Sequence, residues 1–219
     1  MIELIDVRKR YGATEVLKGI SIKAGEGEFV TIRGKSGAGK TTLLKIIGLL
    51  ESPDDGKLKI FGHDAERLSD DEKSNLRLHY IGFVFQFFNL IPSLTIFENV
   101  ELPLALAGIN KKERQKRAHQ LFEYFDLTSL SQRFPETLSG GERQRIAVIR
   151  ALANSPKIIL ADEPTSSLDD ENSELLMNLL VDINRRRKVT VMLTTTDLYE
   201  RLPADNEYFL KEGCLHELI

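Results

Sequence analysis

Apolar residues recur along this chain with two different spacings. Short apolar runs rich in β-branched residues predict strands; they are IELIDV, VLKGISIKAG, FVTIR, KLKIFG, KIILADE, VTVML and EYFLKEG. Helical spacing appears in TTLLKIIGLL and through residues 68–155, where Pro92, Pro103 and Pro135 are expected to break it. Strands thus alternate with helices around a helical insertion, which predicts an α/β fold with a mainly parallel sheet.

Length and composition allow one large domain with a real core. The chain has 219 residues, of which 42% are hydrophobic and 29% are charged. Its net charge of −3 argues against a non-specific nucleic-acid binder, because such proteins are usually basic. The single cysteine, Cys214, excludes an internal disulfide and fits a reducing compartment. No signal-peptide core and no apolar run of ~20 residues is visible, so we expect neither secretion nor a membrane crossing.

The stretch GKSGAGKTT lies between a predicted strand and a predicted helix and matches G-x-x-x-x-G-K-[ST]. Its glycines allow backbone N–H groups to surround phosphates, and the helix adds the positive end of its dipole. Lys40 is expected to neutralise the β- and γ-phosphates, and Thr41 to offer its hydroxyl to Mg²⁺. The predicted nucleotide-binding residues are Gly34, Lys35, Ser36, Gly37, Ala38, Gly39, Lys40, Thr41 and Thr42.

Two further stretches carry candidate chemistry. KIILADEPT is an apolar strand that ends in Asp162, expected near the metal, and Glu163, expected to orient or deprotonate the attacking water. Alone, such acids are often only solvated, but the phosphate loop favours the catalytic interpretation. LSGGERQR predicts a helix start with a capping box between Ser139 and Glu142. Its two glycines, Gly140 and Gly141, also leave bare N–H groups for an anion.

Together these three stretches resemble the phosphate loop, acidic strand and signature motif of ABC-type ATPases. By that resemblance Tyr11, in KRYG, would stack on adenine. Gln86, in FVFQ, would touch Mg²⁺ and the attacking water, and Asp169, in SSLDD, would communicate across a dimer. The resemblance covers essentially the whole chain. It is closest to the branch that includes lipoprotein-release, macrolide-export and cell-division ATPases.

The resemblance implies a P-loop NTPase core with an antiparallel β edge, formed by residues 1–86 and 157–219, and a helical subdomain at about 87–156. Two chains would pack head to tail when ATP is bound, each ATP lying between one phosphate loop and the other chain's SGGE. The implied cofactors are ATP and Mg²⁺. The helical subdomain would dock an integral membrane permease, some phenylalanines of FVFQFFNL filling the core and others lining the docking groove. The protein would then sit in the cytoplasm, on the inner face of the cell membrane.

One residue that the family pattern contains is missing. A histidine usually follows the strand after the acidic motif, just before an aspartate; here the strand is VTVML, the aspartate is Asp197, and Thr196 stands in its place. Thr194 or Thr195 would offer the same hydroxyl if the alignment were shifted. Threonine is shorter and carries no charge, and losing one transition-state contact typically costs ~10²–10³ in rate.

Two interpretations therefore stay open. In the first, Glu163, Gln86 and Thr196 form the catalytic set of a slow ATPase that powers or gates a transporter of export or extraction type. In the second, the chain binds ATP and dimerises with little turnover, as a switch for its membrane partner. A soluble ATPase acting on ribosomes or DNA is disfavoured, because those relatives usually carry two such domains or a long coiled-coil insertion.

Overall fold

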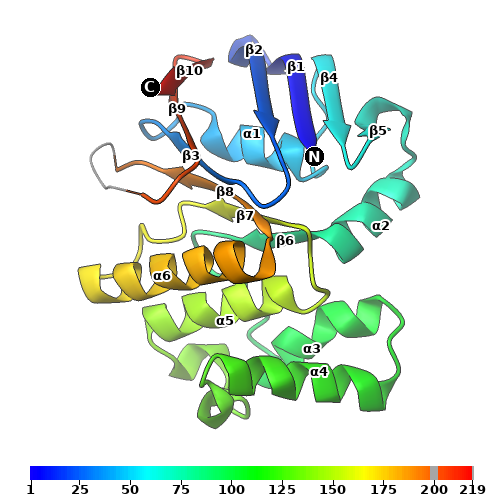
Figure 1. Cartoon of the computed structure of the whole chain (residues 1–219), viewed down its shortest axis with the longest axis vertical. Coiled ribbons are helices and arrows are strands. Elements are labelled where there is room, and N and C mark those ends of the chain that lie inside the picture. The colour runs from blue at the N-terminus through cyan, green and yellow to red at the C-terminus, as the bar shows by residue number, and fades with distance from the viewer. Residues whose placement is uncertain (198–201, 219) are drawn as a thin grey trace.

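A mainly parallel sheet forms the centre of the molecule, in the computed structural model that describes residues 1–197 and 202–218 (Figure 1). Its strand order is β10-β9-β3-β8-β7-β6, parallel throughout except for the antiparallel hairpin of β9 and β10. The strands are β3 (Phe29–Arg33), β6 (Ile81–Val84), β7 (Ile158–Asp162), β8 (Thr190–Thr195), β9 (Asn206–Lys211) and β10 (Cys214–Leu218). The expected α/β fold is confirmed.

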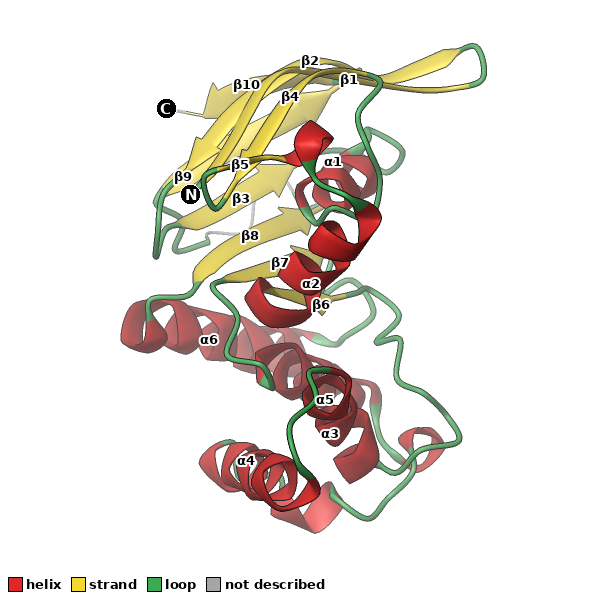
Figure 2. Ribbon diagram, turned by 90° about the vertical axis from the view of Figure 1, so that its right-hand side faces the viewer, coloured by secondary structure: helices red, strands yellow, loops and turns green. Residues whose placement is uncertain are grey.

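A second, antiparallel sheet contains the N-terminal strands, in the order β2-β1-β4-β5. Its members are β1 (Ile2–Tyr11), β2 (Thr14–Ala24), β4 (Asp55–Ile60) and the short β5 (His63–Asp64). Helix α1 (Lys40–Ile47) lies between this sheet and the parallel one (Figure 2). The antiparallel edge therefore covers the helix that leaves the phosphate loop.

Alternate residues of the central strands point into two separate cores, as the pleat of a strand requires. Val30 and Met192 pack with α1 and the antiparallel sheet. Phe29 and Val191 pack on the opposite face with the helices that follow β6. Because both faces are covered, these strands are apolar almost throughout, which explains their unbroken apolar runs in the sequence.

The helices of the second core are α3 (Ile96–Leu106), α4 (Lys111–Tyr124), α5 (Gly140–Leu152) and α6 (Asp170–Arg187). Helices α5 and α6 lie nearest the sheet, and α3 and α4 lie beyond α5 (Figure 1). Helix α2 (Asp70–Tyr80) leads into β6, and short 3₁₀ turns occupy Ala65–Arg67, Thr128–Leu130 and Pro135–Thr137. No helix in the described ranges is long and apolar enough to cross a membrane.

The expectation of helix throughout residues 68–155 is wrong at two points. Residues 81–84 form strand β6, which pairs with β7; four residues are too few to reveal a period. Pro103 does not break a helix but lies inside α3, which ends three residues later at Leu106. Strand β10 was not predicted either, because most of its residues are exposed and it has no buried face to impose alternation.

Candidate functional site

The predicted phosphate loop joins the buried end of β3 to α1. Gly37 and Gly39 have φ values of 77° and 104°, in the left-handed region that favours glycine. At Gly34 an added Cβ would lie 2.6 Å from the carbonyl oxygen of Leu210, so a larger residue does not fit. No side chain caps α1, which leaves its first N–H groups for another acceptor. The loop thus has the open backbone that the motif predicts.

Lys40 is the first residue of α1, and its side chain is only 3% exposed. Its ammonium donates to the carbonyl oxygens of Gly34, at 2.7 Å, and Lys35, at 3.1 Å. It also pairs with Glu163 Oε1 at 3.0 Å, although the two residues are far apart in the sequence. The structure therefore brings together the two residues that the sequence analysis selected for charge neutralisation and for catalysis.

Asp162 and Glu163 stand at the end of β7, as predicted, and one side chain of β8 organises both. Thr194 Oγ1 donates to Asp162 Oδ1 at 2.7 Å. The N–H of Glu163 lies 3.1 Å from both Thr194 Oγ1 and the Thr194 carbonyl oxygen. Glu163 has a φ of 45°, a conformation that non-glycine residues rarely adopt and that marks functional sites. Thr194 thus fixes the carboxylate of Asp162 and the backbone of Glu163.

The three threonines at the end of β8 are not equivalent, contrary to the expectation from the sequence. Thr194 is committed to Asp162, and buried Thr195 accepts a hydrogen bond from the N–H of Asp197 at 3.0 Å. Thr196 is exposed in the bend that follows. Thr196 is therefore the most accessible of the three to a ligand at the surface.

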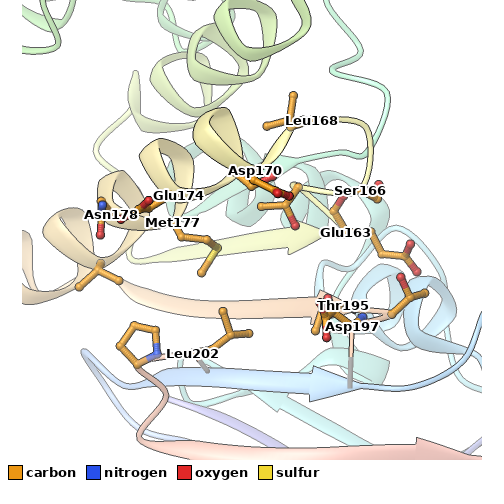
Figure 3. Close-up of a pocket in the computed structure, with 15 residues that line it drawn as sticks. Glu163, Ser166, Leu168, Asp170, Glu174, Met177, Asn178, Thr195, Asp197 and Leu202 are labelled. Carbon is orange, nitrogen blue, oxygen red and sulfur yellow. Dashed lines mark hydrogen bonds between the residues drawn. The ribbon is translucent and has the colours of Figure 1, made fainter. Parts of the chain in front are cut away.

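Thr195, Thr196 and Glu163 line a pocket of about 510 Å³ between α6 and the end of β8 (Figure 3). The opposite wall carries the acidic side chains of Asp170 and Glu174. No residue of the phosphate loop lines it. Carboxylates on that wall would repel phosphate, so we regard the open loop, and not this pocket, as the seat of the triphosphate.

Tyr11 ends β1 and is 47% exposed. Its hydroxyl donates to Glu51, which also pairs with Lys45 of α1 at 3.2 Å. Lys9 Nζ lies 5.7 Å from the centre of the Tyr11 ring, a cation–π contact on the ring. The bond to Glu51 raises the pKa of the Tyr11 hydroxyl. The ring is thus anchored to the helix that begins in the phosphate loop.

Gln86 is half-buried just after β6, and its carbonyl oxygen accepts from Ser167 Oγ at 3.4 Å. The phenylalanines around it differ in their surroundings. Phe83 and Phe85 stack with their ring centres 5.6 Å apart and line a groove of about 310 Å³, whereas Phe87 is 73% exposed. Arg143 covers the ring of Phe88 at 5.0 Å.

The predicted capping box of α5 is present. The N–H of Ser139 donates to Glu142 Oε2 at 2.7 Å, and the N–H of Glu142 lies 3.2 Å from Ser139 Oγ. The bond from the Ser139 N–H lowers the pKa of Glu142. Gly141 is buried against α6, where an added Cβ would lie 2.1 Å from Asn172 Oδ1. Gly140 is more open, with Leu168 Cδ2 at 3.7 Å from its Cβ position.

Asp169 caps α6 and accepts hydrogen bonds from the Asn172 N–H at 2.8 Å and from Asn172 Nδ2 at 2.9 Å. The bond from the Asn172 N–H lowers the pKa of Asp169. Because Asn172 also touches Gly141, the SGGE turn and the Asp169 turn lie side by side. Between these turns and residues 34–42, all of which are described, there is no hydrogen bond or ion pair.

Sequence reasoning missed two residues that organise the site. Glu51 anchors Tyr11, and Thr194 links Asp162 with Glu163. Neither belongs to a motif, and both reach their partners across 31 or more residues of sequence. One feature of the sequence could have predicted the role of Thr194: it lies on a strand expected beside the acidic strand in the parallel sheet, so its side chain could reach Asp162.

The donor set fits Mg²⁺ bound together with phosphates. Thr41, Asp162 and Gln86 offer a hydroxyl, a carboxylate and an amide oxygen, and Mg²⁺ prefers oxygen ligands. The described residues contain no cluster of three or more His, Cys, Asp or Glu that could hold a metal unaided. Mg²⁺ usually takes one or two carboxylates and fills its shell with water and substrate oxygens.

Comparisons with known proteins agree with the resemblance found in the sequence. The sequence pattern of the ABC transporter family matches residues 17–166. The lipoprotein-releasing system ATP-binding protein LolD of Bacteroides fragilis is 46% identical over 197 residues, which cover 90% of this chain and 91% of that protein. MJ0796, an ABC transporter ATP-binding protein of Methanocaldococcus jannaschii, is 44% identical over 224 residues, covering 97% and 94% of the two chains.

Two solved structures of MJ0796 resemble the whole fold. The dimeric cassette superposes with a TM-score of 0.90 at 41% identity, covering 100% of this chain and 99% of that one. A dimeric post-hydrolysis state bound to ADP and Pi gives a TM-score of 0.89 at 40% identity, with the same coverage. The likeness therefore extends beyond the motifs to the complete arrangement of both sheets and their helices.

Proposed function

The chain belongs to the ABC transporter family, and we propose that it is the ATPase subunit of an export- or extraction-type transporter, which drives or gates a membrane partner. The observation that carries this proposal is the pairing of Lys40 and Glu163 at 3.0 Å. It places the cation of the phosphate loop against the carboxylate selected as catalytic. The ATP-binding role itself follows from the family.

The pairing suggests how binding prepares catalysis. A triphosphate in the loop would take hydrogen bonds from the first N–H groups of α1 and from Lys40 Nζ. Lys40 would then turn from Glu163 toward the phosphates, and the freed carboxylate would orient the attacking water. Thr41, Asp162 and Gln86 would hold Mg²⁺, which supplies charge neutralisation on the phosphate oxygens when bound. Tyr11 would stack on the base.

We further propose that the site is completed by a second copy of the chain. The bare N–H groups of Gly140 and Gly141 make no hydrogen bond to their own phosphate loop, so they would serve the loop of a partner chain. The two similar MJ0796 structures are dimeric, which supports this arrangement. A head-to-tail pair would place each SGGE turn over the other chain's γ-phosphate, with Asp169 beside it.

Because Thr196 stands where relatives carry a histidine, we expect this chain to hydrolyse ATP more slowly than they do. It is exposed at the end of β8 and lines the same pocket as Glu163, so its hydroxyl is in the right neighbourhood. A neutral hydroxyl is a shorter and weaker partner for a γ-phosphate than an imidazole. We therefore propose slow hydrolysis.

The membrane partner would dock on the groove lined by Phe83, Phe85, Leu102 and Leu106. Leu106 is 67% exposed beside the other apolar residues of this groove, and contiguous exposed apolar surface marks an interaction site. Phe87 is more exposed still and follows Gln86 directly, so contact there would reach the nucleotide site. Docking would hold the protein on the inner face of the cell membrane.

The test is steady-state ATP hydrolysis by the purified chain, alone and with its membrane partner. Wild type is expected to turn over, and Glu163→Gln to lower turnover by about 10²-fold or more. Thr196→His should raise turnover. Glu174→Gln, which changes a carboxylate in the same pocket away from Lys40, is the matched control and should leave turnover unchanged.

The second candidate function, an ATP-dependent switch with little turnover, rests on Thr196. It would be supported if wild type bound ATP and dimerised yet hydrolysed none with its partner present. Restoration of turnover by Thr196→His would then identify the missing histidine as the cause. A wild-type chain that failed to bind ATP would contradict both candidates.

A further inference from the structure

Gln144 lies one turn into α5 and is completely buried. Its side-chain nitrogen, Nε2, donates to two backbone carbonyl oxygens: that of Phe85 at 3.2 Å and that of Pro164 at 2.8 Å. Phe85 directly precedes Gln86, and Pro164 directly follows Glu163. One buried amide therefore holds both loops that carry the proposed γ-phosphate contacts.

The orientation of this amide is fixed by chemistry. A backbone carbonyl only accepts hydrogen bonds, so both partners require the NH₂ end of the glutamine, and a flipped amide would face two acceptors with its oxygen. The other end, Gln144 Oε1, is buried and has no hydrogen-bond partner in the described residues. Leaving an acceptor unpaired costs about 1–3 kcal/mol, which offsets much of what the two donated hydrogen bonds contribute to stability.

Helix α5 is held on its other side as well. Gly141 packs so closely on Asn172 that an added Cβ would lie 2.1 Å from Asn172 Oδ1. Asn172 is in turn bonded to Asp169. The first turn of α5 is thus fixed between the start of α6 and the Gln144 bonds, and a helix transmits a shift at Gln144 to Gly140 within one turn.

We propose that Gln144 is a positioning residue that sets the SGGE turn according to the state of the Gln86 and Glu163 loops. The inference rests on the proposed function of those loops. When a bound nucleotide moves Gln86 or Glu163, the adjoining carbonyls of Phe85 and Pro164 move too. Gln144 follows them, and the N–H groups of Gly140 and Gly141 are aimed at, or turned from, the second chain's phosphate.

The test is Gln144→Met, which keeps a long unbranched side chain of similar size and removes both donors. We expect kcat for ATP to fall by about 10–100-fold, as for other small misplacements of reacting groups, while KM changes little. The thermal midpoint should fall modestly, because removal of Nε2 leaves the carbonyl oxygens of Phe85 and Pro164 without their donor while the unpaired Oε1 is removed as well. Gln144→Leu is the second variant if Gln144→Met does not fold. Gln120→Met, on the exposed face of α4, is the matched control.

A fall in kcat that came with an equal rise in KM would assign Gln144 a merely structural role. Unchanged kcat in a folded Gln144→Met would overturn the inference directly. Neither result would bear on the ATPase assignment, which wild type and Glu163→Gln test.

Amide hydrogen exchange gives a readout that does not need turnover. In wild type, ATP should slow exchange at residues 139–143, and in Gln144→Met this ATP-dependent slowing should be lost although ATP still binds. Equal slowing in both proteins would overturn the inference alone. If wild type neither bound ATP nor hydrolysed it, the proposed function would fail and this inference would fall with it.

Discussion

Helices α2 and α5 begin with the same capping box, yet the N-terminus of α2 is covered by acidic side chains and that of α5 is bare. Ser69 and Ser139 have nearly identical backbone angles, with φ and ψ of −64° and 163° in one and −65° and 165° in the other. Each serine accepts from the N–H of a glutamate three residues on, Glu72 or Glu142, and each glutamate accepts from the serine N–H. Local folding alone does not distinguish them.

The two residues inside each box make the difference. In α2 they are Asp70 and Asp71, whose charges already complement the helix dipole and would repel an anion. In α5 they are Gly140 and Gly141, which add no charge and no side chain over the N–H groups. A capping box is therefore a folding signal, and only the residues beside it decide whether the helix end is available to phosphate.

The largest expected effect comes from giving α5 the charge of α2. Gly140→Asp places a carboxylate on the helix end, and the Cβ position is open enough to accept a side chain. We expect ATP turnover to fall by about 10²-fold or more, as when a transition-state donor is lost. Nucleotide binding to the single chain should persist, because that chain's own phosphate loop is untouched.

Steady-state hydrolysis and equilibrium ATP binding together test this prediction. Gly140→Ala is the control for size, because it adds a side-chain carbon without a charge. Asp70→Gly makes the reciprocal change in α2 and should leave turnover unchanged. Normal turnover in Gly140→Asp would show that this helix end does not meet phosphate.

A smaller effect should follow from removing the capping serines. Ser69→Ala and Ser139→Ala should each lower the free energy of unfolding by about 1 kcal/mol, because each leaves one helix N–H without its acceptor. Only Ser139→Ala should also lower turnover. Urea unfolding and ATP hydrolysis of both variants provide the measurements, and equal turnover in the two would remove the functional distinction between these helices.

The smallest expected effect is on how the stability of the folded chain depends on pH. The serine N–H bonds lower the pKa of both Glu72 and Glu142 in the folded chain. A depressed folded pKa contributes stability above the ordinary glutamate pKa of ~4.3, and this contribution is lost as pH falls through the folded pKa. Glu72→Gln and Glu142→Gln should therefore be less stable than wild type near neutral pH.

In acid the difference should shrink, because wild-type glutamates become protonated as well. Urea unfolding near neutral pH, and again about one unit below ~4.3, measures this convergence. A constant gap between wild type and both variants across that range would show that the two carboxylates titrate alike in the folded and unfolded chains.

Contiguous features were predictable from sequence because their physics is local. The phosphate loop needs only its own glycines, Lys40 and the flanking strand and helix, and all stand as expected. The Ser139 capping box likewise closes within four residues. By contrast, β6 was hidden inside a stretch predicted as helix, since four residues with no clear period carry little signal.

Residues whose role depends on a distant partner were not predictable in this way. Thr194, Thr195 and Thr196 share one chemistry in the sequence, but the parallel register sets Thr194 opposite Asp162, whereas Thr196 lies exposed just after β8. Glu51 belongs to no motif and lies 40 residues from Tyr11 in the sequence. Gln144 lies within LSGGERQR, but nothing in that stretch specifies its partners Pro164 and Phe85, which are 20 and 59 residues away.

By itself the sequence determined the α/β class, the family, the phosphate loop and the absence of the expected histidine, because each is written in contiguous residues or their period. Only the tertiary structure decided that Lys40 meets Glu163, that Thr194 is occupied, and that Gln144 joins three motif segments. The physical reason is that strand order and helix docking are chosen by packing of the whole core. That packing alone brings residues distant in the chain within hydrogen-bond distance.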